Sequence, residues 1–177
     1  MDLTGDELAG VVDLFAALTR PELGRALAEL AYKRGEDREP DAFDPLIDEA
    51  VASYHLVAFA PDAEHDDGGA VDGGAGIDGA SGAGSTVPWL LAGPIAFPEL
   101  PEGGEDLPHI LEIETRSVDR AALGAAVRDR LRRDAAEAIV ADDEERMAQL
   151  VDVSYELEAW APVDATATRE RLDRELG

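Results

Sequence analysis

The sequence TGDELAGVVDLFAALTRPELGRALAELAYKRG, residues 4–35, carries two helix-start signals in succession. Thr4 and Glu7 make a capping box, in which the threonine hydroxyl accepts from the glutamate N–H while the glutamate carboxylate accepts from the threonine N–H. Thr19 and Glu22 repeat the pattern. Apolar residues follow each box at helical spacing, so the segment predicts two adjacent amphipathic helices.

The residues after this pair predict a third helix and a small sheet. Asp44 is expected to cap a helix of about ten residues that has Pro45 in its first turn. Residues 55–59 and 89–91 have the composition of strands, and apolar residues alternate with glutamate over 109–115, which predicts a third strand. Three helices followed by two strands that a long loop joins is the order of a winged helix.

The last third of the chain has helical periodicity throughout. Ser117 is expected to cap a long helix that ends near Ala141, a second helix is expected over 143–160, and a short tail helix over 164–176. The two long helices predict a helical hairpin. Their expected buried stripes are Leu123, Val127, Leu131, Ala135 and Ala138 in the first helix and Met147, Leu150, Val151, Ser154 and Leu157 in the second.

These elements predict an α+β fold with four parts. Three helices and a first strand form a winged-helix-like unit over 1–60, strands of a small antiparallel sheet occupy 87–116, and the helical hairpin with its tail helix occupies 117–177. The intervening residues 61–86 hold eight glycines, six acidic residues and no lysine or arginine. They lack the apolar area that would offset the entropy of ordering, so we expect a disordered loop there.

Composition excludes several classes of protein. The 177 residues include 40 acidic and 15 basic ones, for a net charge of -25, and no cysteine, which excludes disulfides, thiol catalysis and cysteine-ligated zinc. No apolar run is long enough to span a bilayer, and the acidic start lacks the basic region of a secretory signal. Lys33 is the single lysine beside fourteen arginines. This balance favours a salt-adapted cytoplasmic protein with no membrane partner, because salt screens the repulsion among its carboxylates.

Motifs identify no catalytic, cofactor-binding or metal-binding residue. Residues 74–79 fit the dinucleotide fingerprint, but no predicted strand enters it and no predicted helix leaves it. Residues 73–81 approximate a calcium-binding nonapeptide in a single copy, whereas that fold stacks several. His55, His65 and His109 have none of the spacings typical of metal or nucleophile sites. We therefore expect no cofactor and no enzymatic activity.

One local cluster of positive charge stands out. Six arginines lie within residues 116–133, opposed there only by Asp119 and Asp129, for a local net charge of +4. They either pair with the acidic helix that follows or contact an anionic partner. The acidic residues available for pairing are Glu144, Glu145, Asp152 and Glu156. The candidate contacts for an anionic partner are Arg120, Arg128, Arg130, Arg132 and Arg133.

These features favour a non-enzymatic module for protein interaction or assembly, which docks another protein or a second copy of itself through the arginine-rich helix or an exposed side of the hairpin. The alternative is a DNA-binding winged-helix transcriptional regulator, and the second alternative is a small-molecule enzyme. Nucleic acid is the less favoured partner because the third helix, which would enter the major groove, offers Asp48, Glu49 and Ser53. The second helix does carry a basic edge of Arg20, Arg25, Lys33, Arg34 and Arg38.

Two resemblances agree with this assignment. The opening DLTGDELAGVVDLFAALTRPELGRALAELAYKRGED, followed by PLIDEAVASYHLVAF and the Gly/Asp-rich segment, resembles a family of uncharacterised haloarchaeal proteins of unknown function. The segment LTRPELGRALAEL is similar to the first helices of winged-helix regulators. The resemblance to the haloarchaeal family implies a salt-adapted cytoplasmic protein, and it identifies no functional residues.

Overall fold

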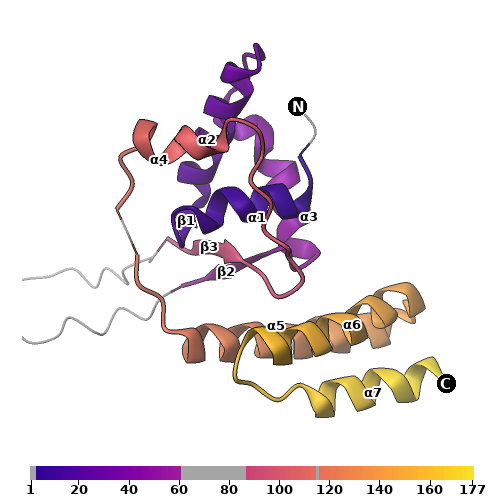
Figure 1. The fold of residues 1–177 in the computed structure, drawn as a ribbon. Helices are drawn as coiled ribbons and strands as arrows, with labels where there is room; N and C mark the ends of the chain where they lie inside the picture. Colours follow the sequence, from indigo (N-terminus) through magenta and orange to yellow (C-terminus); the bar gives the residue numbers. More distant parts are fainter. Residues whose placement is uncertain (1–2, 61–86, 115) are drawn as a thin grey trace, which may run out of the picture.

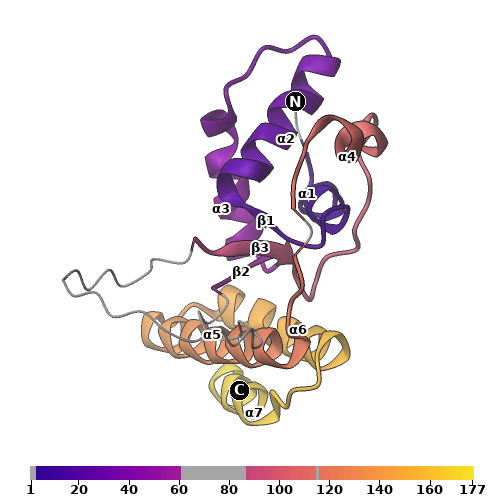
Figure 2. The same ribbon diagram turned by 90° about the vertical axis from the view of Figure 1, so that its left-hand side faces the viewer.

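The computed structural model describes residues 3–60, 87–114 and 116–177. Its elements lie in layers around one three-stranded sheet (Figures 1 and 2). The elements in chain order are α1 (Gly5–Asp13), β1 (Leu18–Thr19), α2 (Arg20–Lys33), the 3-10 helix η1 (Pro40–Phe43), α3 (Asp44–Ala52), β2 (Leu56–Phe59), β3 (Trp89–Ala92), the 3-10 helix η2 (Gly104–Asp106), α4 (Leu107–Ile110), α5 (Arg120–Ala141), α6 (Glu144–Trp160) and α7 (Thr166–Leu176).

The layers follow the order of the chain. Helices α1 to α3 cover one face of the sheet, the α5–α6 hairpin covers the other, and α7 lies on the outer side of the hairpin (Figure 2). The expected α+β class, the small antiparallel sheet and the helical hairpin are thus confirmed. The expected loop over 61–86, and His65 within it, lie outside the described residues. None of the described helices is long and apolar enough to cross a bilayer.

Both predicted capping boxes are present. The Glu7 N–H donates to the Thr4 hydroxyl at 3.1 Å and the Thr4 N–H donates to the Glu7 carboxylate at 2.9 Å. In the second box the Thr19 N–H donates to the Glu22 carboxylate at 2.7 Å. Each reciprocal pair satisfies backbone donors that the first turn of a helix leaves without intrahelical partners. The two helix starts therefore lie where the sequence places them.

The third strand was predicted in the wrong place. Residues 107–110 form the short helix α4, with Pro108 in its first turn, and 111–114 have no regular structure. The third strand is instead β1, whose two residues pair with Leu90 and Trp89 of β3. Leu111 and Ile113 are partly buried, and they pack against the core that includes residues of α1 and α2 without joining the sheet. The alternation of these two residues with glutamate therefore arises because one side of an irregular segment faces the core.

Two helix starts also differ from the prediction. Helix α5 begins at Arg120, where Asp119 and not Ser117 accepts from the first backbone N–H groups. Asp44 lies inside α3 and makes no cap, because η1 runs directly into α3 and Phe43 occupies the cap position. The Asp44 carboxylate instead accepts from the Arg20 guanidinium at 3.1 Å. Asp44 is thus of a residue type that commonly caps helices, but here its side chain forms an ion pair and not a cap.

The sheet carries two cores, one on each face. Leu56 of β2 and Leu90 of β3 belong to the core beneath α1 to α3, while the adjacent Val57 and Leu91 belong to the core shared with α5 to α7. Alternate strand residues face opposite sides of a sheet, which gives this division directly. The expected stripe of α5 is buried as predicted; in α6, Val153 is buried and Val151 only partly so.

A bidentate ion pair ties the segment before α5 to the second capping box. Two nitrogens of the Arg116 guanidinium each lie 2.7 Å from a Glu22 carboxylate oxygen, and both side chains are only 15% exposed. Burial opposes the charge on Glu22, but hydrogen bonds from Arg116 and from Thr19 outweigh it and lower the pKa of this carboxyl from 4.5 to about 2. The ionised form of Glu22 therefore stabilises the fold.

We predict that Glu22→Gln destabilises the protein in a pH-dependent way. The folded pKa is below the unfolded one, so this contribution is complete above about pH 4.5 and is lost as the pH falls through about 2. At pH 7 the variant should lose about 3 kcal/mol of unfolding free energy, and the difference from the parent should shrink steadily between pH 4.5 and pH 2. Denaturant unfolding at several pH values measures it.

The control is Glu29→Gln, which neutralises another carboxylate on α2. Within the part of the chain that the structure describes, Glu29 has no ion pair, so this change should cost less than about 0.5 kcal/mol at every pH. A Glu22→Gln deficit of equal size at pH 7 and pH 2.5 would contradict the ionisation of Glu22 as its cause.

Candidate anion-binding groove

The five candidate arginines from the sequence go to different places. Arg120, in the first turn of α5, places its guanidinium 4.8 Å from the centre of the Trp160 ring and donates to the Trp160 carbonyl at 3.0 Å. This contact joins the beginning of α5 to the end of α6. Arg120 is therefore engaged in holding the hairpin together.

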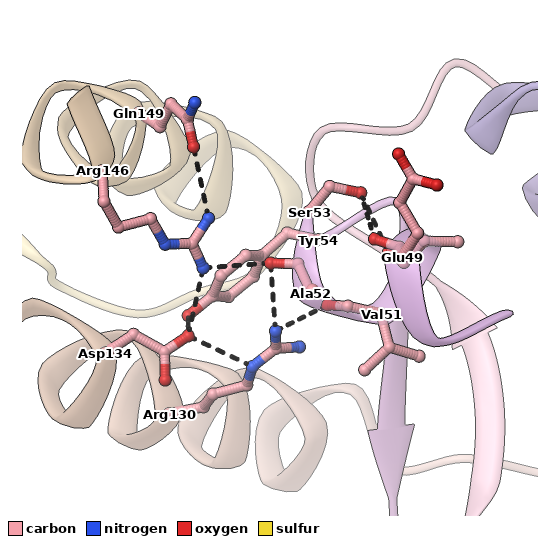
Figure 3. A network of polar contacts seen from close by, with 10 residues as sticks. Glu49, Val51, Ala52, Ser53, Tyr54, Arg130, Asp134, Arg146 and Gln149 are labelled. Carbon is pink, nitrogen blue, oxygen red and sulfur yellow. Dashed lines mark hydrogen bonds and ion pairs between the residues drawn. The ribbon is translucent and has the colours of Figure 1, made fainter. Parts of the chain in front are cut away.

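Arg130 is engaged at the boundary between the hairpin and α3. Its guanidinium donates to the carbonyl of Val51 in the last turn of α3 and lies 3.9 Å from the centre of the Tyr54 ring (Figure 3). It also pairs with Asp134 one turn further along α5, at 3.5 Å. A cation is favourable here, because the last carbonyls of a helix lack intrahelical donors and carry the negative end of its dipole.

Arg146 of α6 approaches the same point from the other side of Tyr54 (Figure 3). Its guanidinium donates to the Ala52 carbonyl at 3.0 Å and lies 3.6 Å from Asp134. The Tyr54 hydroxyl donates to Asp134 at 2.7 Å. Burial, and then this hydrogen bond, raise the pKa of Tyr54. We call Tyr54, Arg130, Asp134 and Arg146 the Tyr54 network; it joins α3, α5 and α6 with every charge partnered.

The three remaining candidates lie on the outer side of α5. Arg128 pairs with the adjacent Asp129 at 3.1 Å, and Arg132 approaches the same carboxylate at 3.8 Å with 66% of its side chain exposed. Arg133 makes no ion pair within residues 3–60, 87–114 and 116–177. Among the described residues, no ion pair joins these arginines to the acidic residues of α6, so the expected pairing with that helix is wrong.

Arg132 and Arg133 line a groove between α5 and α7. Arg171 of α7 completes it from the opposite wall, and no ion pair to Arg171 occurs in the described part of the chain. The groove has a volume of about 540 Å³, within the range of ligand-binding clefts. Three arginines and one aspartate give it a net charge of +2. The lining residues are Asp129, Arg132, Arg133, Ala135, Ala136, Ala167, Thr168 and Arg171.

Helix α7 is held firmly enough to form a wall of this arginine groove. Leu172 is fully buried against the hairpin core. Arg169, only 12% exposed, donates to Glu158 of α6 at 3.1 Å and to Ser154 at 3.2 Å. The Glu158 carboxylate also accepts from the Ala165 N–H at 2.9 Å, which fixes the beginning of α7. Packing therefore fixes α7, the helix that carries Arg171, against the hairpin that carries the α5 arginines.

The groove can bind an anion, but its lining offers no nucleophile paired with a base. Guanidinium groups bind carboxylates and phosphates through parallel hydrogen bonds. The lining residues other than arginine are alanines, Thr168 and Asp129, and Asp129 is held by Arg128. Among the described residues, no three His, Asp or Glu side chains gather as a metal site would require.

A serine, a histidine and an aspartate do meet elsewhere. Ser53 Oγ lies 2.8 Å from His55 Nδ1, and His55 Nε2 lies 3.8 Å from Asp6 Oδ1. The Ser53 hydroxyl donates its proton to the Glu49 carbonyl at 2.8 Å, one helical turn earlier. A nucleophilic serine must donate to the histidine that activates it, whereas the Ser53 hydroxyl also lies within hydrogen-bonding distance of the Glu49 and Ala50 carbonyls, an arrangement typical of serine at the end of a helix.

Sequence reasoning found part of this groove and missed the rest. Arg132 and Arg133 were among the candidates, whereas Arg171 was not, because it lies in the tail helix far along the chain. The available signal was helical spacing, which puts Arg171 one turn after Ala167 and beside Thr168 on one side of α7. Spacing cannot show that this side faces α5.

We predict that Tyr54→Phe destabilises the protein by about 2 kcal/mol, because it removes a hydrogen bond to a charged carboxylate that is only partly exposed. Tyr32→Phe is the matched control: Tyr32 is 72% exposed and should change the unfolding free energy by less than about 0.5 kcal/mol. Urea unfolding followed by circular dichroism compares the two. Equal stabilities of the two variants would contradict the assigned role of Tyr54.

The comparisons with known proteins identify a family. No curated protein matches the chain, and no solved structure does. A family model described as "Family of unknown function (DUF7109)" matches residues 6–177 and so includes every helix from α2 to α7 and the groove between α5 and α7. The chain belongs to this family of unknown function.

Proposed function

We propose that this protein is a non-enzymatic interaction module, and that its arginine groove docks a short acidic segment of a partner protein. One observation carries the proposal. Arg132, Arg133 and Arg171 meet from two helices around one groove in a chain of net charge -25, and two of the three have no carboxylate partner among the described residues. An anionic group in the groove would supply those partners.

The shape of the groove favours a peptide segment over a long polyanion. Its lining includes the small residues Ala135, Ala136 and Ala167, which leave room for a backbone to approach. Its three arginines occupy one groove, whereas nucleic acid is usually bound along a track of many phosphate contacts. A segment with two or three carboxylates matches this number of guanidinium groups.

We infer that the N-terminal elements form a winged-helix-like unit. The order helix, short strand, helix, helix, strand, strand and the sheet order β1-β3-β2 support this assignment, as does the resemblance of the segment around Thr19 to winged-helix regulators. In this arrangement α3 occupies the place of the recognition helix.

DNA binding through this unit is the alternative function. The negative charges of α3 disfavour it. Arg20, at the beginning of α2, pairs with Asp44 and Asp48 of α3. Asp48 and Glu49 are exposed on α3. A phosphate backbone approaching this helix would therefore meet carboxylates. In our proposal the winged-helix-like unit serves as a scaffold for the hairpin.

The proposal places the protein in a salt-rich cytoplasm. Forty acidic residues beside fifteen basic ones suit a solvent in which the Debye length is only about 3 Å, because repulsion between carboxylates is then screened. Screening also weakens long-range attraction. Recognition in such a solvent depends on short-range guanidinium–carboxylate hydrogen bonds, which the arginine groove provides.

We predict that fluorescein-labelled hexaglutamate binds the protein and that Arg132→Glu combined with Arg133→Glu and Arg171→Glu weakens this binding at least tenfold. Each lost contact is worth about 0.5 to 1 kcal/mol, and about 1.4 kcal/mol corresponds to a tenfold change. The variant should keep its melting temperature, since these side chains are exposed. Fluorescence anisotropy titrations in 0.15 M and 1 M salt measure the affinities.

The matched control reverses one arginine of α2 and two of the segment after it: Arg25→Glu, Arg34→Glu and Arg38→Glu. It should bind hexaglutamate within twofold of the parent. A 20-base-pair DNA duplex is titrated in parallel. If the duplex binds and the α2 variant loses it while the groove variant keeps it, the DNA-binding alternative is correct. Equal hexaglutamate binding by the parent and both variants would also overturn the proposal.

A further inference from the structure

A second groove lies on the opposite side of the hairpin from the arginine groove. It is formed by α6 and by the chain that follows β3, which turns toward α6 in both views (Figures 1 and 2). Its volume is about 420 Å³. Ile95, Phe97 and Val153 form an apolar lining, and 74% of Phe97 is exposed. We call it the Phe97 groove.

The wall that carries Phe97 is tied to the rest of the fold by backbone hydrogen bonds. The Phe97 N–H donates to the Asp6 carboxylate at 2.8 Å, and the Glu99 N–H donates to the Asp6 carbonyl at 3.0 Å. At the start of the turn, the Gly93 N–H donates to the His55 carbonyl at 2.8 Å. The exposed ring therefore stands on a fixed support beside the partly buried Ile95 and the buried Val153.

The rim of the Phe97 groove is acidic. Gln149, Asp152 and Glu156 lie on one side of α6 at helical spacing and line the groove with Val153. Arg146, the one basic lining residue, is already bound to the Ala52 carbonyl and to Asp134. Within the described residues, Asp152 and Glu156 make no ion pair. The groove thus combines an apolar centre with two carboxylates that have no cation.

We propose that the Phe97 groove docks a basic amphipathic segment of a partner protein. An apolar side chain of that segment inserts between Phe97, Ile95 and Val153, and its flanking lysine or arginine side chains pair with Asp152 and Glu156. The complementarity of charge identifies the occupant: an acidic segment would be repelled here, whereas the arginine groove on the other side would attract it. The two grooves therefore select partners of opposite charge.

The test uses the full chain and a fluorescein-labelled peptide of sequence KRLLKR, followed by anisotropy. We expect Phe97→Ser to weaken binding at least tenfold, because it removes the apolar centre. We expect Asp152→Lys combined with Glu156→Lys to weaken it at least tenfold, because it reverses the rim. The matched peptide EDLLDE, with the same apolar residues, should show no loss of affinity in either variant.

Three control variants separate this proposal from its alternatives. Val140→Ser removes an apolar side chain that is 87% exposed outside the groove, and Asp37→Lys with Glu39→Lys repeats the charge change elsewhere; both should bind KRLLKR within twofold of the parent. Arg132→Glu with Arg133→Glu and Arg171→Glu should also leave KRLLKR binding unchanged, so a failure of the arginine groove is distinguishable from a failure here.

Either of two results would overturn the proposal. The first is KRLLKR binding that Phe97→Ser and the rim variant leave unchanged. The second is sedimentation of the parent as a dimer that Phe97→Ser converts to a monomer, which would make this groove the contact between two copies of the chain. A monomeric parent together with the expected losses supports a partner protein.

Discussion

The buried side chain of Tyr54, held between two arginines and one aspartate, joins α3 to both helices of the hairpin. It follows the end of α3 with a positive φ of 67°, a conformation that a residue with a side chain adopts only where its surroundings compensate the strain. Here the compensation comes from burial, from Asp134 and from two guanidinium groups that also bind the last carbonyls of α3. One side chain thus joins the N-terminal helices to the hairpin.

This arrangement explains how arginines are distributed in a strongly acidic chain. Those that hold the fold together, such as Arg116, Arg130 and Arg169, are at most about a fifth exposed and each has a carboxylate and a backbone or hydroxyl oxygen as partner. Those of the arginine groove are exposed and lack a complete set of partners. The arginines therefore fall into two groups: those that stabilise the fold and those that are available to bind a ligand. Among the described residues, carboxylates divide in the same way: Asp134 is paired in the Tyr54 network, whereas Asp152 and Glu156 of the Phe97 groove make no ion pair.

Local rules predicted much of this fold from sequence. The capping boxes at Thr4 and Thr19 and the stripes of α5 and α6 depend on residues a few positions apart, and these were found. The third strand was missed because two residues at Leu18 carry too little pattern; only pairing with β3, some seventy residues later, makes them a strand. The groove between α5 and α7 was not predicted, for the same reason. Arg132 and Arg133 form a visible cluster in the sequence, but they meet Arg171 only because α7 packs on the hairpin. Arg169 and Leu172 hold α7 there. Helical periodicity relates residues a few positions apart, so it does not predict a contact between helices this far apart in the sequence.

We expect the shared sheet and the Tyr54 network to join α1 to α3 and α5 to α7 into one cooperative unit, so that both grooves are formed before any partner binds. Native-state hydrogen exchange tests this most directly. We expect the slowest amides of α5 and α6 to exchange with the same opening free energy as those of α2, β2 and β3, and to respond equally to low concentrations of denaturant. Exchange of α5 to α7 through a separate opening of lower free energy, while α2 stays protected, would contradict the claim and show that the grooves belong to a part that unfolds by itself.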